Sequence, residues 1–409
     1  MTLVRVPELR ARGTGIVPLL IARALRDFGD GFVAVLLPVY LIALGFSVLQ
    51  VGVIATSALL GSASLTMLIG LIGARFNQRG LLLAAACLMC ITGVAFAAVH
   101  DYAPLLLVAF AGTINPSAGS VSVFVPLEHT VLSRIVSDRE RTKMFARYSL
   151  VGALASGFGA LAASAPDFLQ KMDVDRVAAI KLMFLAYALL GVVGGLLYRF
   201  IPVRPRSVTV EGVEALGPSR RIVYKLAALF SIDAFAGGFV VQSLLALWLF
   251  QRFDLSLSAA SLFFFWSGVL SAFSFPVAAW LSKRIGLVNT MVWTHVPSSL
   301  CLMLAAVAPK LTIALVLLLI RAALSQMDVP TRSSYVMAVV TEPERPAAAS
   351  FTSVPRSLAA AVSPAMAGAL FAASFQALPL IICGSLKIIY DLLLLLQFRL
   401  VKPPEERQL

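Results

Sequence analysis

Four ionisable side chains stand inside an apolar segment near the start of the chain, in the run IARALRDFGDGFVAVLL at 21–37. They are Arg23, Arg26, Asp27 and Asp30. Unpaired, four charges at the centre of a membrane-spanning helix would cost about 10 to 14 kcal/mol. At 100° per residue the four positions fall within an arc of about 100°, and Arg23 with Asp27, and Arg26 with Asp30, can pair. This face is therefore predicted to contact protein or water, not lipid.

A second apolar segment, LLLIRAALSQMDVPTRSSY at 317–335, repeats the pattern. Its polar side chains on one helical stripe are Arg321, Ser325, Asp328, Arg332 and Tyr335. Pro330 lies on the opposite side, where it removes a backbone hydrogen bond and permits a bend. Asp30 and Arg321 stand deepest in their segments, where insertion is most costly and a purely structural role is least rewarded.

Two further apolar segments carry isolated polar groups. INPSAGSVSVFVPLEH at 114–129 places Asn115 and Ser117 next to a proline and Glu128 near its cytoplasmic end, and a later segment carries Asp233. Because all these residues interrupt apolar runs, they are expected to face the interior of a helical bundle.

The chemistry of these groups suits proton and ion transfer. A buried carboxylate beside an arginine can change its protonation state, because burial and the cation act on its pKa in opposite directions. The expected proton-coupling residues are Asp27, Asp30, Arg26 and Asp233. Guanidinium groups bind carboxylates and phosphates bidentately, whereas the aspartates could equally bind a cation, so the sign of the substrate's charge stays open. The expected substrate-binding residues are Asn115, Ser117, Arg321, Asp328 and Arg332.

A structural role is the alternative for each of these groups, since polar contacts between transmembrane helices contribute only about 0.6 kcal/mol each. That interpretation weighs more for Arg23 and Arg356, and it is preferred for Lys387 and Asp391, which are four residues apart and can pair. His295 is expected to be buried with its hydrogen bonds satisfied.

The composition requires that these residues be positioned by a membrane bundle. Of the 409 residues, 60% are hydrophobic and only 13% are charged, which excludes a soluble globule. Apolar runs of about 20 residues, long enough to cross a bilayer, recur along the chain. About twelve membrane-spanning helices are predicted, near 15–44, 48–74, 80–99, 103–128, 148–165, 178–198, 224–250, 258–281, 287–307, 311–337, 352–374 and 378–398.

The formal net charge of +13 reflects topology and gives no indication of nucleic acid as a partner. With the N-terminus inside, about 22 of the 33 lysines and arginines fall in cytoplasmic segments, as the positive-inside rule requires. Both termini are therefore predicted to face the cytoplasm. The protein is expected to reside in the cytoplasmic membrane. The basic residues before the first run resemble a signal peptide, but that run is too long and too charged to be one.

Catalysis has no support in the residue pattern. The four cysteines all fall inside predicted spans, so no disulfide framework is expected. The sequence contains no nucleophile, histidine and acid set, no metal-ligand spacing and no glycine-rich phosphate loop. We therefore expect neither an enzyme nor a bound cofactor or metal.

The chain also repeats itself at about half its length. SDRERTKMFARYS at 137–149 precedes TEPERPAAASFTS at 341–353 by about 204 positions, and GDGFVAVLL precedes GGFVVQSLL by a similar interval. Such duplication is common in transporters. It predicts an N-terminal half at 1–200, a cytoplasmic linker at 201–222 and a C-terminal half at 223–409.

With these features the chain resembles the major facilitator superfamily. Its marker loop after the second span reads GLIGARFNQRG at 70–80, where Gly70, Arg75 and Arg79 match the family pattern and Ala74 replaces an aspartate. The second copy, AWLSKRIG, keeps Arg284 and Gly286 but has Lys283 at the aspartate position. In the family this loop gates the cytoplasmic side, so the missing aspartates weaken that latch.

The resemblance implies an all-α integral membrane protein of twelve helices in two pseudo-symmetric six-helix bundles, with spans one, four, seven and ten around a central cavity. It implies a monomeric secondary transporter of a small molecule that works by alternating access. We expect coupling to protons and favour efflux slightly over uptake. The alternative is a membrane-embedded sensor that keeps the fold without transporting.

Overall fold

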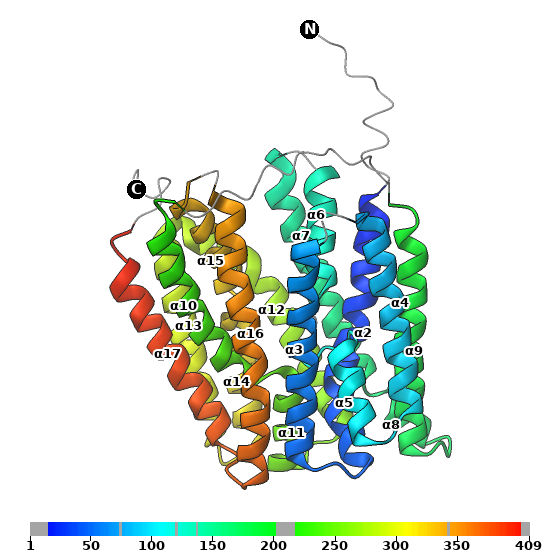
Figure 1. Cartoon of the computed structure of the whole chain (residues 1–409). Helices are drawn as coiled ribbons and strands as arrows, with labels where there is room; N and C mark the ends of the chain where they lie inside the picture. The colour runs from blue at the N-terminus through cyan, green and yellow to red at the C-terminus, as the bar shows by residue number, and fades with distance from the viewer. Residues whose placement is uncertain are drawn as a thin grey trace. The chain divides into compact units, whose positions relative to one another are not determined.

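Helices make up the regular structure of the computed structural model drawn in Figure 1. It describes residues 15–72, 76–118, 122–135, 138–201, 217–341 and 344–401, apart from the side chains of 70–72, 133–135, 138–143 and 346. Within these ranges no β-strand is found, and the all-α fold expected from the sequence is confirmed.

The described residues form two compact units. Unit 1 takes those within Met1–Phe46, Gly61–Val208 and Leu257–Phe265, and unit 2 takes those within Ser47–Leu60, Thr209–Ser256 and Trp266–Leu409. Helices α3 (Val48–Ile72) and α12 (Leu257–Ile285) therefore contribute to both units. The sequence-based halves remain a prediction, because 202–216 of the expected linker lie outside the described residues.

Unit 1 is built around the charged first helix. Its helices are α2 (Ile16–Ala43), α4 (Gln78–Ala98), α5 (Tyr102–Ala111), α6 (Phe124–Ile135), α7 (Asp138–Ala162), α8 (Ala165–Gln170) and α9 (Arg176–Tyr198). Helix α2 packs mainly against α7 and α9. A Cβ atom at Gly31 would lie 2.1 Å from the carbonyl oxygen of Ser156, and one at Gly159 would lie 1.9 Å from that of Phe28. Glycine at both positions thus permits the close approach of α2 and α7.

Unit 2 surrounds a second buried core. Its remaining helices are α10 (Arg220–Gly238), α11 (Gln242–Phe253), α13 (Leu287–Ala306), α14 (Leu311–Ser325), α15 (Asp328–Val339), α16 (Arg345–Ala372) and α17 (Leu378–Phe398). Helix α10 packs against α16 and α17, and α13 packs against α14, α15 and α17. Phe230, Met291, Tyr335 and Tyr390 are buried together at these contacts.

Ten helical segments among the described residues are long and apolar enough to cross a membrane. Helix α2 has 28 residues and carries the four charges that keep it out of this count. The segment expected as a single fourth span is divided between α5 and α6. With these two additions the described helices are consistent with the twelve predicted spans.

Breaks in the helices occur in three of the polar spans. In the fourth span α5 ends at Ala111 and α6 begins at Phe124, and 112–118 and 122–123 are not helical, so the expectation of one continuous helix over 103–128 is wrong. The Asn115 Oδ1 atom accepts the backbone N–H of Ser117 at 2.9 Å, and Ala118 has a φ of +49°, so local turn contacts replace helical ones. The seventh span breaks at 239–241, between α10 and α11.

The tenth span breaks at 326–327, between α14 and α15. Pro330 was expected to bend this helix, but it lies in the first turn of α15, where a missing N–H is tolerated. The proline therefore begins a second helix and does not kink a continuous one.

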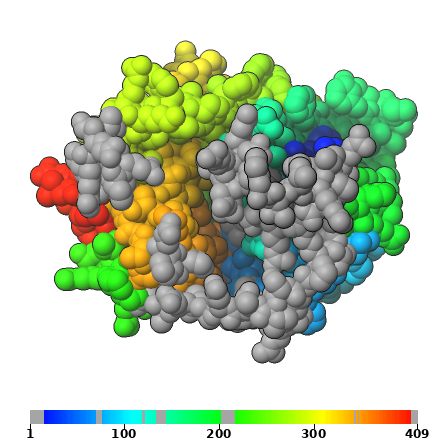
Figure 2. Space-filling view, turned by 90° about the horizontal axis from the view of Figure 1, so that it is seen from above, coloured from blue at the N-terminus to red at the C-terminus, as the bar shows by residue number. Residues whose placement is uncertain are grey.

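Basic residues gather at one end of unit 2. They are Arg220 at the start of α10, Lys283 and Arg284 at the end of α12, Arg345 at the start of α16 and Arg399 after α17. These helix ends lie toward the top of Figure 1, and Figure 2 looks onto them, with the end of α17 in red.

Candidate functional site

The charged face of α2 forms a buried ion-pair network within unit 1. Arg23, Arg26, Asp27 and Asp30 are between 1% and 9% exposed. The Nη2 atom of Arg23 lies 2.7 Å from the Oδ2 atom of Asp27, as the four-residue spacing predicts. The guanidinium of Arg23 also covers the ring of Tyr148, with its Cζ atom 4.6 Å from the ring centroid.

Glu128 on α6 is the centre of this network, although the sequence suggested only a position near the cytoplasmic end. Its side chain is fully buried, and its Oε2 atom lies 2.9 Å from the Nη2 atom of Arg26. Tyr198 donates to Oε1 at 2.6 Å, and Tyr148 donates to Oε2. The only signal in the sequence was one carboxylate in an apolar run, which could not reveal its partners on three other helices.

Arg26 does not pair with Asp30, contrary to what the four-residue spacing allowed, because its guanidinium binds other side chains. Its Nη1 atom lies 3.5 Å from the Oδ1 atom of Asp27 and donates to Ser122 at 3.0 Å, while Nη2 reaches Glu128. A fully buried glutamate needs a cation, and Arg26 supplies it. The guanidinium therefore extends across to α6 instead of along its own helix.

Asp30 is left with a phenol as its hydrogen-bond donor. The hydroxyl of Tyr187 on α9 donates to Asp30 Oδ1 at 3.2 Å and also lies 3.1 Å from the carbonyl oxygen of Thr113. Among the described residues no cation lies within ion-pair distance of Asp30. Two arginines thus face two paired carboxylates, and Asp30 is a surplus acid in the network.

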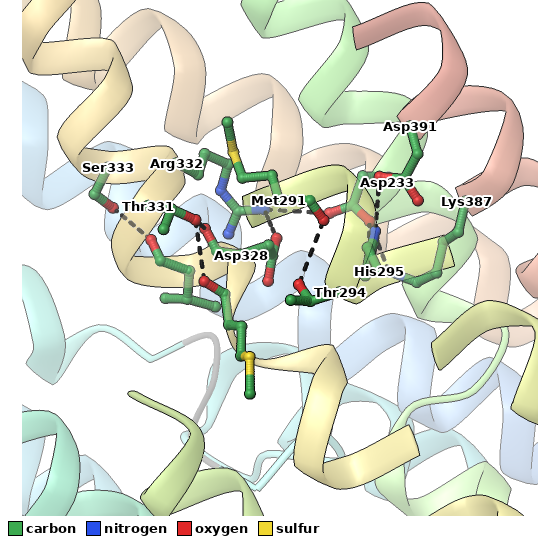
Figure 3. A network of polar contacts seen from close by, with 12 residues as sticks. Asp233, Met291, Thr294, His295, Asp328, Thr331, Arg332, Ser333, Lys387 and Asp391 are labelled. Atoms are coloured by element: carbon green, nitrogen blue, oxygen red, sulfur yellow. Dashed lines mark hydrogen bonds and ion pairs between the residues drawn. The ribbon is translucent and has the colours of Figure 1, made fainter. Parts of the chain in front are cut away.

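A second network lies within unit 2 and joins four helices, as Figure 3 shows. Asp233 of α10 is its hub. Its Oδ2 atom lies 3.2 Å from the Nη1 atom of Arg332, and its Oδ1 atom lies 2.6 Å from the Nζ atom of Lys387 and 3.8 Å from Nε2 of His295. Arg332 Nη1 also lies 2.8 Å from Asp328 Oδ2, so the predicted stripe on α15 is an i, i+4 pair.

His295 fixes the arrangement of hydrogen atoms in this network. Lys387 Nζ lies 3.1 Å from His295 Nε2, and an ammonium can only donate, so Nε2 accepts. The proton of the neutral ring is then on Nδ1, which donates to Asp391 Oδ1 at 3.1 Å. The expectation that Lys387 pairs with Asp391 is therefore corrected: His295 stands between them. The expectation of a buried, hydrogen-bonded His295 is confirmed.

Not every expected site residue joins a network. Asn115 is 1% exposed and stabilises the turn between α5 and α6, and Ser117 supplies the donor to it. Arg321 on α14 has no side-chain hydrogen bond or ion pair with a described residue, and it therefore stands apart from Arg332 in its bonding. The predicted substrate residues thus fall into three groups. Asn115 and Ser117 form a turn, Asp328 and Arg332 form an ion pair, and Arg321 has no ion-pair partner among the described residues.

The chain matches a known protein family over most of its length. The family model described as Major Facilitator Superfamily matches residues 19–232 and 226–409. The chain belongs to the major facilitator superfamily. This confirms the resemblance inferred from the sequence, and the fold is that of membrane transporters and not of enzymes.

Individual proteins resemble the chain over nearly its whole length. An uncharacterized membrane protein of Saccharomyces cerevisiae is 22% identical over 411 residues, with 91% of this chain and 92% of the relative covered. A D-xylose–proton symporter structure has a TM-score of 0.74 at 16% identity, covering 93% of this chain and 96% of its own. A bacterial homologue of the human lysosomal transporter Spinster has a TM-score of 0.69 at 15% identity, covering 94% and 95%. These structural likenesses show the fold alone.

The superfamily's marker loop is seen in part. Gly70 lies in the last turns of α3, and Arg75 lies outside the described residues. Asn77, which replaces a family glycine, caps α4 by accepting the backbone N–H of Arg79 at 3.0 Å. In the second copy, the guanidinium of Arg284 stacks over the ring of Trp280, with its Cζ atom 4.3 Å from the ring centroid.

Gly286 has a φ of +87° between α12 and α13, a conformation that favours glycine. It thus has a backbone reason to be glycine, independent of gating.

Proposed function

We propose that the protein is a proton-coupled secondary transporter of a small molecule, in which Asp30 binds the coupling proton. The observation that carries this proposal is the charge balance of the buried network in unit 1. Arg23 and Arg26 are matched by Asp27 and Glu128, while among the described residues the hydrogen-bond partner of Asp30 is the Tyr187 hydroxyl. An ionised carboxylate left uncompensated at a buried position costs several kcal/mol, and binding a proton removes that cost.

The groups around Asp30 leave no other compensation within the described part of unit 1. The ionisable side chains that act on Asp30 are Arg23, Arg26 and Asp27 on α2 and Tyr187 on α9. Both arginines are already bound to carboxylates, and Tyr187 is the donor to Asp30. Asp27 shares both arginines, so Asp30 is the better proton site of the two candidates.

Arg26 offers a way to convert proton release into movement. It lies one helical turn before Asp30 on α2, but it holds Glu128 on α6. When Asp30 loses its proton, Asp30 and Glu128 compete for the same guanidinium. Transfer of Arg26 to Asp30 would release the link between α2 and α6, which provides the two-state element that a coupled transporter needs. In unit 2, Asp233 is held by two cationic partners, Arg332 and Lys387, and is a secondary candidate.

Several further features belong to the proposal. The name of the D-xylose–proton symporter shows that this fold can couple transport to protons in another protein. The basic helix ends of unit 2 favour cytoplasmic termini by the positive-inside rule, in a cytoplasmic membrane. We propose a monomer that exports its substrate by alternating access.

The proposal is tested by proton movement in proteoliposomes that contain the full-length protein and an internal pH-sensitive dye. Metabolites, organic ions and antibiotics are added one at a time, and the wild type is expected to move protons with at least one of them. Asp30→Asn should abolish this movement while substrate exchange partly persists. The matched control is Asp173→Asn, an exposed aspartate whose φ of +62° asparagine also tolerates.

Normal substrate-driven proton movement by Asp30→Asn would remove Asp30 from the coupling role. Saturable binding of a compound without any movement of substrate or proton by the wild type would favour the sensor.

A further inference from the structure

Two arginines in unit 2 have no carboxylate partner in the part of the chain that the structure describes. Arg321 on α14 and Arg356 on α16 form no side-chain hydrogen bond or ion pair with any described residue. The Nε atom of Arg356 is buried and has no acceptor among them. A buried guanidinium donor without an acceptor is costly, and an oxyanion is the ligand that its planar fork fits best.

The carboxylates of the network in Figure 3 each have a partner, and the Oδ2 atom of Asp391 is buried without an acceptor or donor contact among the described residues. Asp233 holds Arg332 and Lys387, Asp328 holds Arg332, and Asp391 accepts from His295. With His295 neutral, these three acids face the cations Arg332, Arg356 and Lys387, and Arg321 on α14 adds a fourth cation to the unit. A cationic ligand would have to displace a tethered cation from Asp233, whereas an anion meets donors that have no other acceptor.

Arg356 interacts electrostatically with Arg332, Asp233 and Asp328 of the second network. Its helix α16 packs against both α10, which carries Asp233, and α15, which carries Arg332. Arg356 and Arg332 are close enough for their like charges to repel each other. An oxyanion between two guanidinium groups would turn this repulsion into two attractive contacts.

We propose that the substrate is a small organic anion whose carboxylate or phosphate binds Arg356, with Arg332 beside it. The inference rests on the proposed transport function and names the substrate class for it. It also assigns a substrate residue, Arg356, that the predicted set did not contain. Arg332 contributes through the donors that Asp233 and Asp328 leave open, because only its Nη1 atom is bound to them.

The charges of the two units also predict that a proton binds together with the anion. Unit 1 carries one surplus acid, Asp30, and unit 2 one surplus cation. Binding one proton to Asp30 and one monovalent anion to Arg356 neutralises both. With both ligands bound, the two sites therefore carry no net charge.

Thermal unfolding of the purified full-length protein tests the anion site without any proton gradient, at constant ionic strength. The probes are benzoate, 2-oxoglutarate, phenyl phosphate and glycerol 3-phosphate, with benzyl alcohol, benzylamine and glycerol as uncharged or cationic counterparts. At least one oxyanion should raise the unfolding temperature of the wild type, because ligands of the native state stabilise it. The counterparts should not.

Arg356→Gln should weaken that binding at least about tenfold, as expected for loss of charge-assisted hydrogen bonds. Arg356→Lys keeps the charge, removes the fork, and should show a smaller loss, which protects the test against a glutamine variant that fails to fold. Arg220→Gln, at an exposed arginine of the same unit, should bind as the wild type does.

Stabilisation by the counterparts alone, by none of the oxyanions, or equally in wild type and both Arg356 variants would overturn the anion site. Because no proton movement is measured, such failure is distinct from failure of Asp30 in the proteoliposome assay. Anion binding that depends on Arg356 supports the site even if Asp30→Asn still moves protons.

Discussion

Replacement of Glu128 by glutamine tests the ion pair that links α2 to α6. The change keeps the size of the side chain but removes the charge that faces Arg26 at 2.9 Å and receives the hydroxyl groups of Tyr148 and Tyr198. Breaking a buried ion pair by removing one partner costs about 3–5 kcal/mol. Arg26 retains Asp27 at 3.5 Å, so we expect a loss of about 3 kcal/mol in the free energy of unfolding.

A double-mutant cycle separates this pair from general damage. Arg26→Gln alone should be similarly destabilising, because it leaves Glu128 buried and ionised without its cation. The double variant should lose less than the sum of the two single losses, by about 2 kcal/mol, since neither charge is then left alone. Unfolding of the protein in mixed detergent micelles measures the four free energies. Additivity within about 0.5 kcal/mol would refute the direct Arg26–Glu128 interaction.

Two further predictions concern other contacts. Gly152→Ala should destabilise the protein by about 2 kcal/mol in the same assay, because its Cβ would lie 2.4 Å from Asp27 Oδ2, whereas Gly194→Ala, with nothing within 4 Å, should not. Hydrogen bonds from Ser219 and Thr341 lower the pKa of Glu344 from 4.5 to about 2. The wild type should therefore have a larger free energy of unfolding than Glu344→Gln above pH 4.5. This difference should decrease as the pH falls from 4.5 toward 2, because the carboxylate becomes protonated.

The architecture could be predicted from the sequence because bilayer crossing imposes a strong local signal. Long apolar runs, basic loops and a repeat near half-length were enough to indicate a twelve-span transporter fold. The same local reasoning identified Arg23–Asp27 and Asp328–Arg332, whose partners lie one turn apart on a single helix.

Contacts between helices could not be predicted in the same way. Helical spacing allowed Arg26 to pair with Asp30 and Lys387 with Asp391, but Glu128 and His295 on other helices decided the outcome. The break in the fourth span depends on a local turn in which Asn115 accepts the backbone N–H of Ser117. That Arg356 has no ion-pair partner among the described residues likewise depends on which carboxylates other helices bring near it.

The central claim is that Asp30 binds a proton inside the membrane-spanning bundle. Infrared difference spectroscopy of the purified full-length protein, recorded as the pH is changed, detects the carbonyl stretch of a protonated carboxylic acid directly and requires no known substrate. The account predicts such a band in the wild type and in Asp173→Asn, and its loss in Asp30→Asn. A band of the same intensity and pH dependence in Asp30→Asn would contradict the account.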